Sequence, residues 1–165
     1  MPTEMRSYEW ESTEAAQDFL LQMSGLEYCT RVMEGHYPLA PIFKTMSLQI
    51  AAVAEGRVQL RLEPHAYLMH GRGVLHGGVM STLLDSAMSW AALSTLPRGG
   101  TLTTVHLGID FIRPVSSHSG TICADGRIVN AGRHLIFLDA SATTQEGKLL
   151  ATGRSTCYIT QRPPR

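Results

Sequence analysis

The most restrictive feature of the sequence is a long apolar stretch, residues 79–96, that directly follows a glycine-rich segment, residues 71–78. No glycine or proline interrupts the apolar stretch before Pro97. A helix over these residues would be apolar around almost its whole circumference, and such a helix must be buried rather than lie on a surface. The sequence therefore predicts one buried central helix that the rest of the chain has to cover.

A narrow polar stripe interrupts the apolar surface of this predicted helix. Ser81, Thr82, Asp85 and Ser89 are three or four residues apart, so they line up on one side of the helix. Asp85 is the only charged residue in the stretch. A carboxylate in a buried helix costs free energy unless it is paired or has a chemical role, which makes Asp85 a candidate catalytic residue.

The glycines that precede the helix indicate a binding site for an oxygen atom. A helix start leaves backbone N–H groups without partners and is partly positive. Gly77 and Gly78 have no Cβ, so another molecule can approach this backbone closely. The pair predicts a cradle for a phosphate, a carboxylate or a carbonyl oxygen that develops negative charge. For Gly71 and Gly73 an ordinary turn explains the sequence equally well.

These motifs resemble a known family. His76-Gly77-Gly78, followed by Asp85 on an apolar helix, resembles the hot-dog-fold acyl-CoA thioesterases, in particular the PaaI-type group related to phenylacetic acid degradation. The resemblance runs from about Lys44 to Tyr158. It includes Phe111-Ile112-Arg113-Pro114 and the hairpin-like segment Asn130-Ala131-Gly132-Arg133.

The remaining periodicity predicts one helical segment and six strands. Residues 13–33 are typical of a helix, capped by Ser12 or Thr13 and broken at Gly25, and residues 36–41 of a loop. Residues 43–63 alternate like two antiparallel strands around Glu55-Gly56. Four further strands are predicted at residues 101–112, 120–129, 134–144 and 149–160.

Short turns between consecutive strands favour an antiparallel sheet, so the predicted class is α+β, with the sheet wrapped around one long central helix. The resemblance implies the same architecture, the hot-dog fold, with an extra N-terminal helical segment. We predict an N-terminal extension and linker (residues 1–41), a hot-dog domain (42–160) and a tail (161–165). A single curved sheet exposes its edges, which favours a homodimer. The resemblance implies further association into a dimer of dimers.

The amino-acid composition limits the classes of partner and cofactor that we expect. Fourteen basic residues balance fourteen acidic ones, so neither nucleic acid nor a membrane surface is predicted as a partner. Three widely spaced cysteines and a start without a secretory pattern favour a reducing, cytoplasmic location. No histidine or cysteine spacing predicts a metal site. We expect no cofactor, because coenzyme A would be part of the substrate.

The resemblance implies hydrolysis of an acyl-CoA thioester. The Gly77 N–H would polarise the carbonyl, and Asp85 would act either as general base or as nucleophile. Apolar surroundings should raise the pKa of Asp85, and hydroxyl donors on its own helix should lower it again. The resemblance puts a water-positioning hydroxyl at Thr104. Ser89 is the rival for that task, and Thr82 is a further hydroxyl within helical reach.

Several histidines and arginines complete the candidate site. His76 would bind substrate or hold the loop, and we favour the loop. His70 stands where the family commonly has an amide side chain, so its assistance to the carbonyl or the water is a separate hypothesis. Arginines near turns and strand ends are candidates for the phosphates of CoA, although such residues are more often simple surface charges. They are Arg72, Arg113 and Arg133.

Two other functions compete with hydrolysis. A hot-dog hydratase or dehydratase would pair a carboxylate with a nearby histidine, and the helix of Asp85 carries none. A non-catalytic acyl-CoA-binding module would keep the pocket without the carboxylate. The presence of Asp85 disfavours that module and a purely structural protein.

Overall fold

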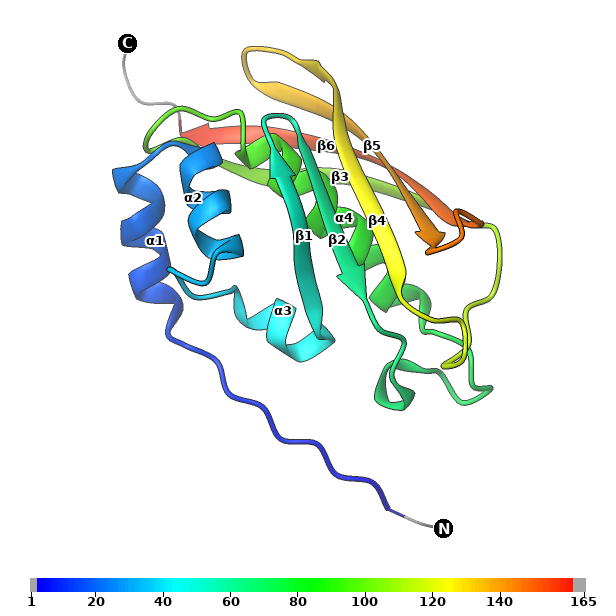
Figure 1. The fold of residues 1–165 in the computed structure, drawn as a ribbon. Coiled ribbons are helices and arrows are strands. Elements are labelled where there is room, and N and C mark those ends of the chain that lie inside the picture. Colours follow the sequence, from blue (N-terminus) through cyan, green and yellow to red (C-terminus); the bar gives the residue numbers. More distant parts are fainter. Residues whose placement is uncertain (1–2, 162–165) are drawn as a thin grey trace.

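The molecule is built on a six-stranded antiparallel sheet (Figure 1). The computed structural model describes residues 3–161, apart from the side chains of residues 13–17. The strands lie side by side in the order β1-β2-β4-β5-β6-β3, which leaves β1 and β3 at the edges. Their bounds are β1 Leu48–Ala54, β2 Arg57–Leu62, β3 Thr101–Phe111, β4 Ile122–Ala131, β5 Leu135–Thr144 and β6 Leu149–Gln161. The four predicted C-terminal strands are confirmed to within two residues at each end.

The central helix α4, Gly77–Leu93, packs across the concave face of this sheet (Figure 1). Nine of its residues are buried, as the apolar pattern predicts. The backbone of β4 passes so close to α4 that position 126 has no room for a side chain. A Cβ at Gly126 would lie 2.4 Å from the carbonyl carbon of Ala87. The helix connects β2 to the far edge strand β3, so the chain crosses beneath the whole sheet. This is the predicted α+β hot-dog fold.

One predicted strand begins too early. The alternation suggests a strand from Phe43, but the structure has a short helix, α3, at Pro41–Met46, and β1 begins only at Leu48. Pro41 is the first residue of α3, where its fixed φ suits a helix and its missing N–H costs nothing. Ser47 ends the helix in the left-handed conformation, with φ at 55°. Six residues of apparent alternation are too few to separate a strand from one helical turn.

The N-terminal segment forms two helices, α1 (Thr13–Gln22) and α2 (Gly25–Met33), beside β1 and α4 (Figure 1). The predicted break at Gly25 is confirmed, because α1 ends at Gln22 and Gly25 is the first residue of α2. Ser24 caps α2 by accepting a hydrogen bond from the Glu27 N–H. The Thr13 side chain and the predicted tail beyond Gln161 lie outside the described residues.

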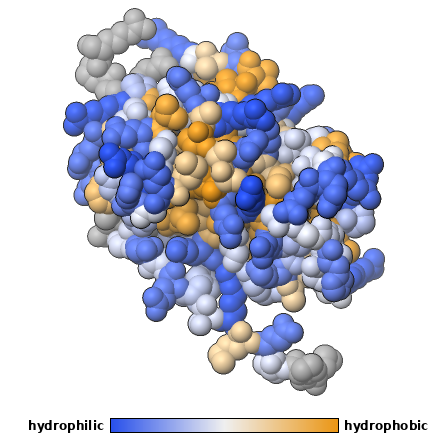
Figure 2. Space-filling view, in the orientation of Figure 1, coloured by the Kyte–Doolittle hydropathy of each residue, from blue (hydrophilic) through white to orange (hydrophobic). Residues whose placement is uncertain are grey.

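Figure 2 shows the surface of the molecule in the orientation of Figure 1, with hydrophobic residues in the middle of the visible face and hydrophilic residues around them. No described helix is both long and apolar enough to cross a bilayer.

Candidate active site

His76 and the two glycines after it form the start of α4. His76 is the N-cap, and its Nδ1 accepts a hydrogen bond of 2.9 Å from the Gly78 N–H. Its ring therefore holds the loop to the helix, which is the loop-fixing role. Within residues 3–161 the Gly77 N–H donates to no protein acceptor. One polarised donor thus remains available at the positive end of the helix.

A pocket of about 300 Å³ opens beside this helix start. Its polar members include Gly77, His70 and Arg113, and its other walls are mainly apolar. His70 Nδ1 accepts a hydrogen bond of 2.9 Å from the Arg72 N–H, so the neutral ring carries its proton on Nε2 and remains a donor there. Arg113 donates to the Leu149 carbonyl at 2.6 Å while its side chain borders the pocket. Three of the predicted residues therefore share one pocket.

Asp85 lies elsewhere on α4, against the edge strand β3. The Thr104 hydroxyl donates to Asp85 Oδ1 at 3.0 Å, and both side chains are half-buried. Burial raises the pKa of Asp85, and the Thr104 hydrogen bond partly offsets that increase. The hydroxyl that lowers the pKa of Asp85 therefore comes from β3. We expected it from the helix of Asp85 itself, and that expectation was wrong.

The other hydroxyls of the polar stripe bond to their own helix. Ser81 donates to the Gly77 carbonyl and Thr82 to the Gly78 carbonyl, each at 2.9 Å. Ser89 donates to the Ser86 carbonyl at 3.3 Å and makes no bond to Asp85. A hydroxyl satisfied by the preceding helical turn is a common arrangement for these residues. Thr104, not Ser89, is therefore the hydroxyl that hydrogen-bonds to Asp85.

Asp85 and Arg133 both lie far from the Gly77 pocket within one chain. Gly77 and Asp85 are eight residues apart on one helix, which corresponds to ~12 Å along its axis. Arg133 lies in the β4–β5 turn, at the end of the sheet where β3 begins, and the Gly77 pocket lies where β3 ends. A single chain thus presents the oxyanion donor and the carboxylate at separate places.

The pocket also contains residues that the sequence analysis did not select. Phe111, Ile112, Met80 and Leu150 supply much of its apolar lining. Phe111 and Ile112 belong to the segment Phe111-Ile112-Arg113-Pro114 that carried part of the resemblance, and only Arg113 was taken from it. Among the described residues, no three His, Cys, Asp or Glu side chains are grouped to hold a metal ion.

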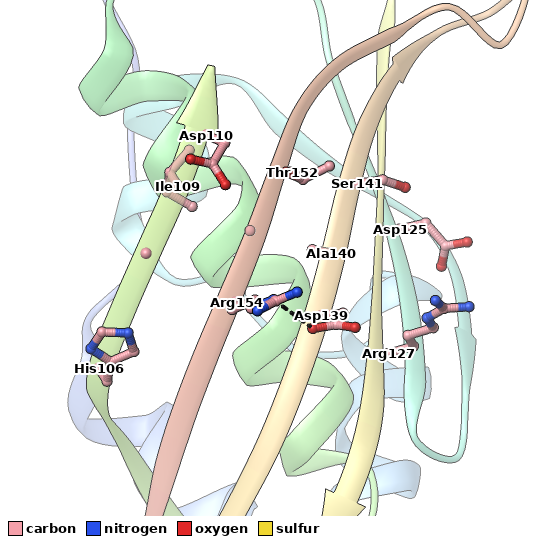
Figure 3. A pocket seen from close by; sticks show the side chains of 12 residues that line it. His106, Ile109, Asp110, Asp125, Arg127, Asp139, Ala140, Ser141, Thr152 and Arg154 are labelled. Carbon is pink, nitrogen blue, oxygen red and sulfur yellow. Dashed lines mark ion pairs between the residues drawn. The ribbon is translucent and has the colours of Figure 1, made fainter. Parts of the chain in front are cut away.

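A second hollow, larger than this pocket, lies on the opposite face of the sheet. It is an open groove of about 700 Å³ on the outer face of the sheet, away from α4, where charged side chains of both signs project (Figure 3). Arg154 and Asp139 form an ion pair there at 3.8 Å, and Arg154 is 88% exposed. None of the predicted site residues lines this groove, and exposed ion pairs of this kind contribute little free energy.

Comparisons with known proteins cover the region that carries these residues. The profile of the family described as Thioesterase superfamily matches residues 72–151. Human acyl-coenzyme A thioesterase 13 is 26% identical over 113 residues, 68% of this chain and 79% of that protein. A thioesterase from Haemophilus influenzae has a TM-score of 0.69 and 26% identity, covering 75% of this chain and 85% of that one. The E. coli PaaI protein of the phenylacetic acid degradation operon shares the fold, with a TM-score of 0.73 and 21% identity over 84% and 95% of the two chains.

Proposed function

We propose that this hot-dog-fold chain is a thioesterase of the superfamily whose profile it matches, and that it hydrolyses acyl-CoA thioesters to a free acid and CoA. The observation that carries the proposal is the pairing of two features on one helix. Gly77, whose N–H has no acceptor in the described part of the protein, lines a mainly apolar pocket. The half-buried carboxylate of Asp85 accepts a hydrogen bond from the Thr104 hydroxyl. An oxyanion donor together with a carboxylate base or nucleophile can catalyse the hydrolysis of a thioester.

The reaction would follow from these two groups. The Gly77 N–H would hydrogen-bond the thioester oxygen and stabilise it as negative charge develops. As general base, Asp85 would take a proton from water while the water oxygen bonds to the carbonyl carbon. The C–S bond would then break, and the proton would pass to the leaving thiolate. As nucleophile, Asp85 would itself bond to the carbonyl carbon and expel the thiolate, and water would then hydrolyse the resulting anhydride.

The distance between Gly77 and Asp85 supports a site shared by two chains. Both groups must come within about 3 Å of the reacting atoms, and one helix cannot present both to one carbon across ~12 Å. Both groups lie along the edge strand β3, with Asp85 near Thr104 and Gly77 near Phe111. Antiparallel pairing of two β3 strands, centred near Leu107 and Gly108, would bring the Thr104 part of each strand beside the Phe111 end of the other. Two equivalent sites per dimer would result.

The exposed side chains of β3 agree with such pairing. In the described part of the chain, β3 bonds to β6 along one side and to no strand along the other. Val105 is 58% exposed on this edge. An unpaired edge of eleven residues with apolar side chains is a ready surface for a second strand. The same arrangement would bring Arg133 of the second copy toward the Phe111 end, where a CoA phosphate could meet it.

Subunit mixing tests the shared site. Asp85→Asn lacks the carboxylate, and Gly77→Pro lacks the N–H donor at a first helical position that tolerates proline. When the two inactive proteins exchange subunits in equal amounts, each mixed dimer holds one intact site. Random pairing makes about half of the dimers mixed, so roughly a quarter of the wild-type thioesterase activity should return.

The controls decide which part of the proposal fails. Exchange is followed with differently tagged subunits, and the fold of each parent by circular dichroism. If exchange occurs and no activity returns, each site lies within one chain. If the wild-type protein releases no CoA from any aryl, short-, medium- or long-chain acyl-CoA, hydrolysis itself is wrong. Addition of water to an enoyl-CoA without release of CoA would instead favour the hydratase alternative.

A further inference from the structure

The ring of Phe111 lies directly against the start of α4. A Cβ placed on Gly77 would be 3.3 Å from Phe111 Cζ and 3.6 Å from Cε1. The aromatic ring and the backbone of Gly77 are therefore in close contact, and the ring also borders the pocket. The ring is therefore close to the residue that carries the available N–H donor.

The side chain of Phe111 is also open to solvent. It is 58% exposed, and the neighbouring Ile112 is 44% exposed. The rest of the pocket wall near Gly77 is apolar, with Met80 and Leu150. A concave, mainly apolar surface with a few polar groups is typical of a site for a small, largely hydrocarbon ligand.

We propose that Phe111 is a specificity-determining residue, whose ring forms the wall of the acyl-binding pocket beside Gly77 and sets the size of acyl group that fits. The inference rests on the proposed function for the position of the thioester carbonyl at Gly77. With its oxygen at the Gly77 N–H, the hydrocarbon tail of the acyl group packs between Phe111, Met80 and Leu150. The pantetheine arm leaves the pocket on the side of His70 and Arg113.

The expected selectivity follows from the energetics of apolar pockets. One methylene group more or fewer in such a pocket changes discrimination between substrates by roughly 10- to 200-fold. Replacement of Phe111 by alanine opens the wall and leaves room for a larger tail. Replacement by tryptophan makes the pocket smaller, so a larger tail is excluded. The two substitutions should shift the preference between tails in opposite directions, which a general loss of stability would not do.

The test measures binding separately from hydrolysis. Two non-hydrolysable analogues, S-(2-oxopropyl)-CoA and S-(2-oxooctyl)-CoA, keep a carbonyl and the whole CoA part but differ in tail length. Their dissociation constants are measured by calorimetry for the wild-type protein, Phe111→Ala, Phe111→Trp and the control Phe137→Ala. Phe137 is 45% exposed on the outer face of the sheet, so its truncation removes the same ring far from Gly77. Thermal unfolding and size-exclusion chromatography check fold and assembly, and Phe111→Leu replaces the alanine variant if the latter unfolds.

We expect Phe111→Ala to change the ratio of the two dissociation constants about tenfold in favour of the longer tail. Phe111→Trp should change the ratio in the opposite direction, and Phe137→Ala should leave it unchanged. An equal change for both analogues would place Phe111 against the shared CoA part and overturn the proposal, and so would failure of either analogue to bind. If the ratio shifts as expected but no acyl-CoA is hydrolysed, the specificity wall stands and the hydrolytic function fails.

Discussion

The two ends of α4 differ sharply, although one continuous helix carries both. At the C-terminal end, which we call the closed end, the Leu96 carbonyl accepts a hydrogen bond of 3.0 Å from the Gly25 N–H of α2. The Ser94 hydroxyl accepts one of 2.8 Å from the Gly56 N–H of the β1–β2 turn. At the N-terminal end, the open end, His76 caps one N–H group, and Gly77, which lines the pocket, has an N–H without an acceptor among the described residues.

This difference shows how one helix combines structural and functional roles. The closed end accepts hydrogen bonds from the backbone N–H groups of two other elements, which fixes the position of the helix under the sheet. The open end leaves a donor without a protein partner, an arrangement that costs free energy unless water or a ligand supplies an acceptor. Asp85 lies between the two ends, where burial makes its charge costly. The least satisfied part of α4 is therefore the part to which we assign chemistry.

The largest expected effect is the loss of activity in Asp85→Asn. The amide has nearly the same volume as the carboxylate but is not a base, so turnover should fall on the order of 100- to 10,000-fold. The hydrolysis of acyl-CoA is followed by CoA release under saturating substrate. A near-normal rate in the folded variant would remove Asp85 from the mechanism and leave the open end as a binding surface only.

A methyl group at the closed end should instead destabilise the fold. In Gly25→Ala the Cβ would lie 1.7 Å from the Leu93 carbonyl oxygen, so α2 must move away from α4. Overpacking of this kind costs roughly 3 kcal/mol of unfolding free energy. Gly71→Ala near the open end is the matched control, because its Cβ would meet no atom within 4 Å. Urea unfolding measures both variants, and equal stabilities would show that the closed end is not tightly packed.

A moderate effect on activity is expected from His70 at the open end. If its Nε2–H assists the carbonyl or the water, His70→Asn should retain activity because the amide also donates, and His70→Ala should lose about tenfold or more. Steady-state rates of the two variants are compared with that of the wild-type protein. Identical rates for asparagine and alanine would reduce His70 to a residue that holds the Arg72 loop.

The smallest effect is a pH-dependent difference in stability. Burial raises the pKa of Asp85 from its ordinary value of 3.8, so the folded protein keeps this proton to a higher pH than the unfolded chain. Asp85 therefore lowers stability progressively as the pH rises from about 3.8 through its folded pKa. Asp85→Asn lacks this penalty, so its melting temperature should exceed that of the wild-type protein near pH 7 and approach it near pH 3. A constant difference across this range would show that Asp85 is not strained by burial.

Prediction from sequence succeeded where one local pattern specifies one structure. The strands β3 to β6 are marked by alternation between clusters of turn residues, and α4 by an apolar run without breakers. It failed at Pro41–Met46, where a six-residue pattern fits both a strand and a helical turn. The predicted break at Gly25 was right, but the sequence does not show that the Leu93 carbonyl lies so close to this glycine.

The sequence by itself determined the buried central helix, its single buried charge and the glycine start, because these depend on the order and spacing of neighbouring residues. Only the tertiary structure decided which residues from other elements complete each part of the site. Thr104 was already a candidate through the resemblance, but its hydrogen bond to Asp85, nineteen residues earlier, results from the crossing of α4 beneath the sheet to the edge strand β3. The same crossing places Phe111 on Gly77, a contact that arises from the packing of a strand end on a helix start and that no local pattern encodes.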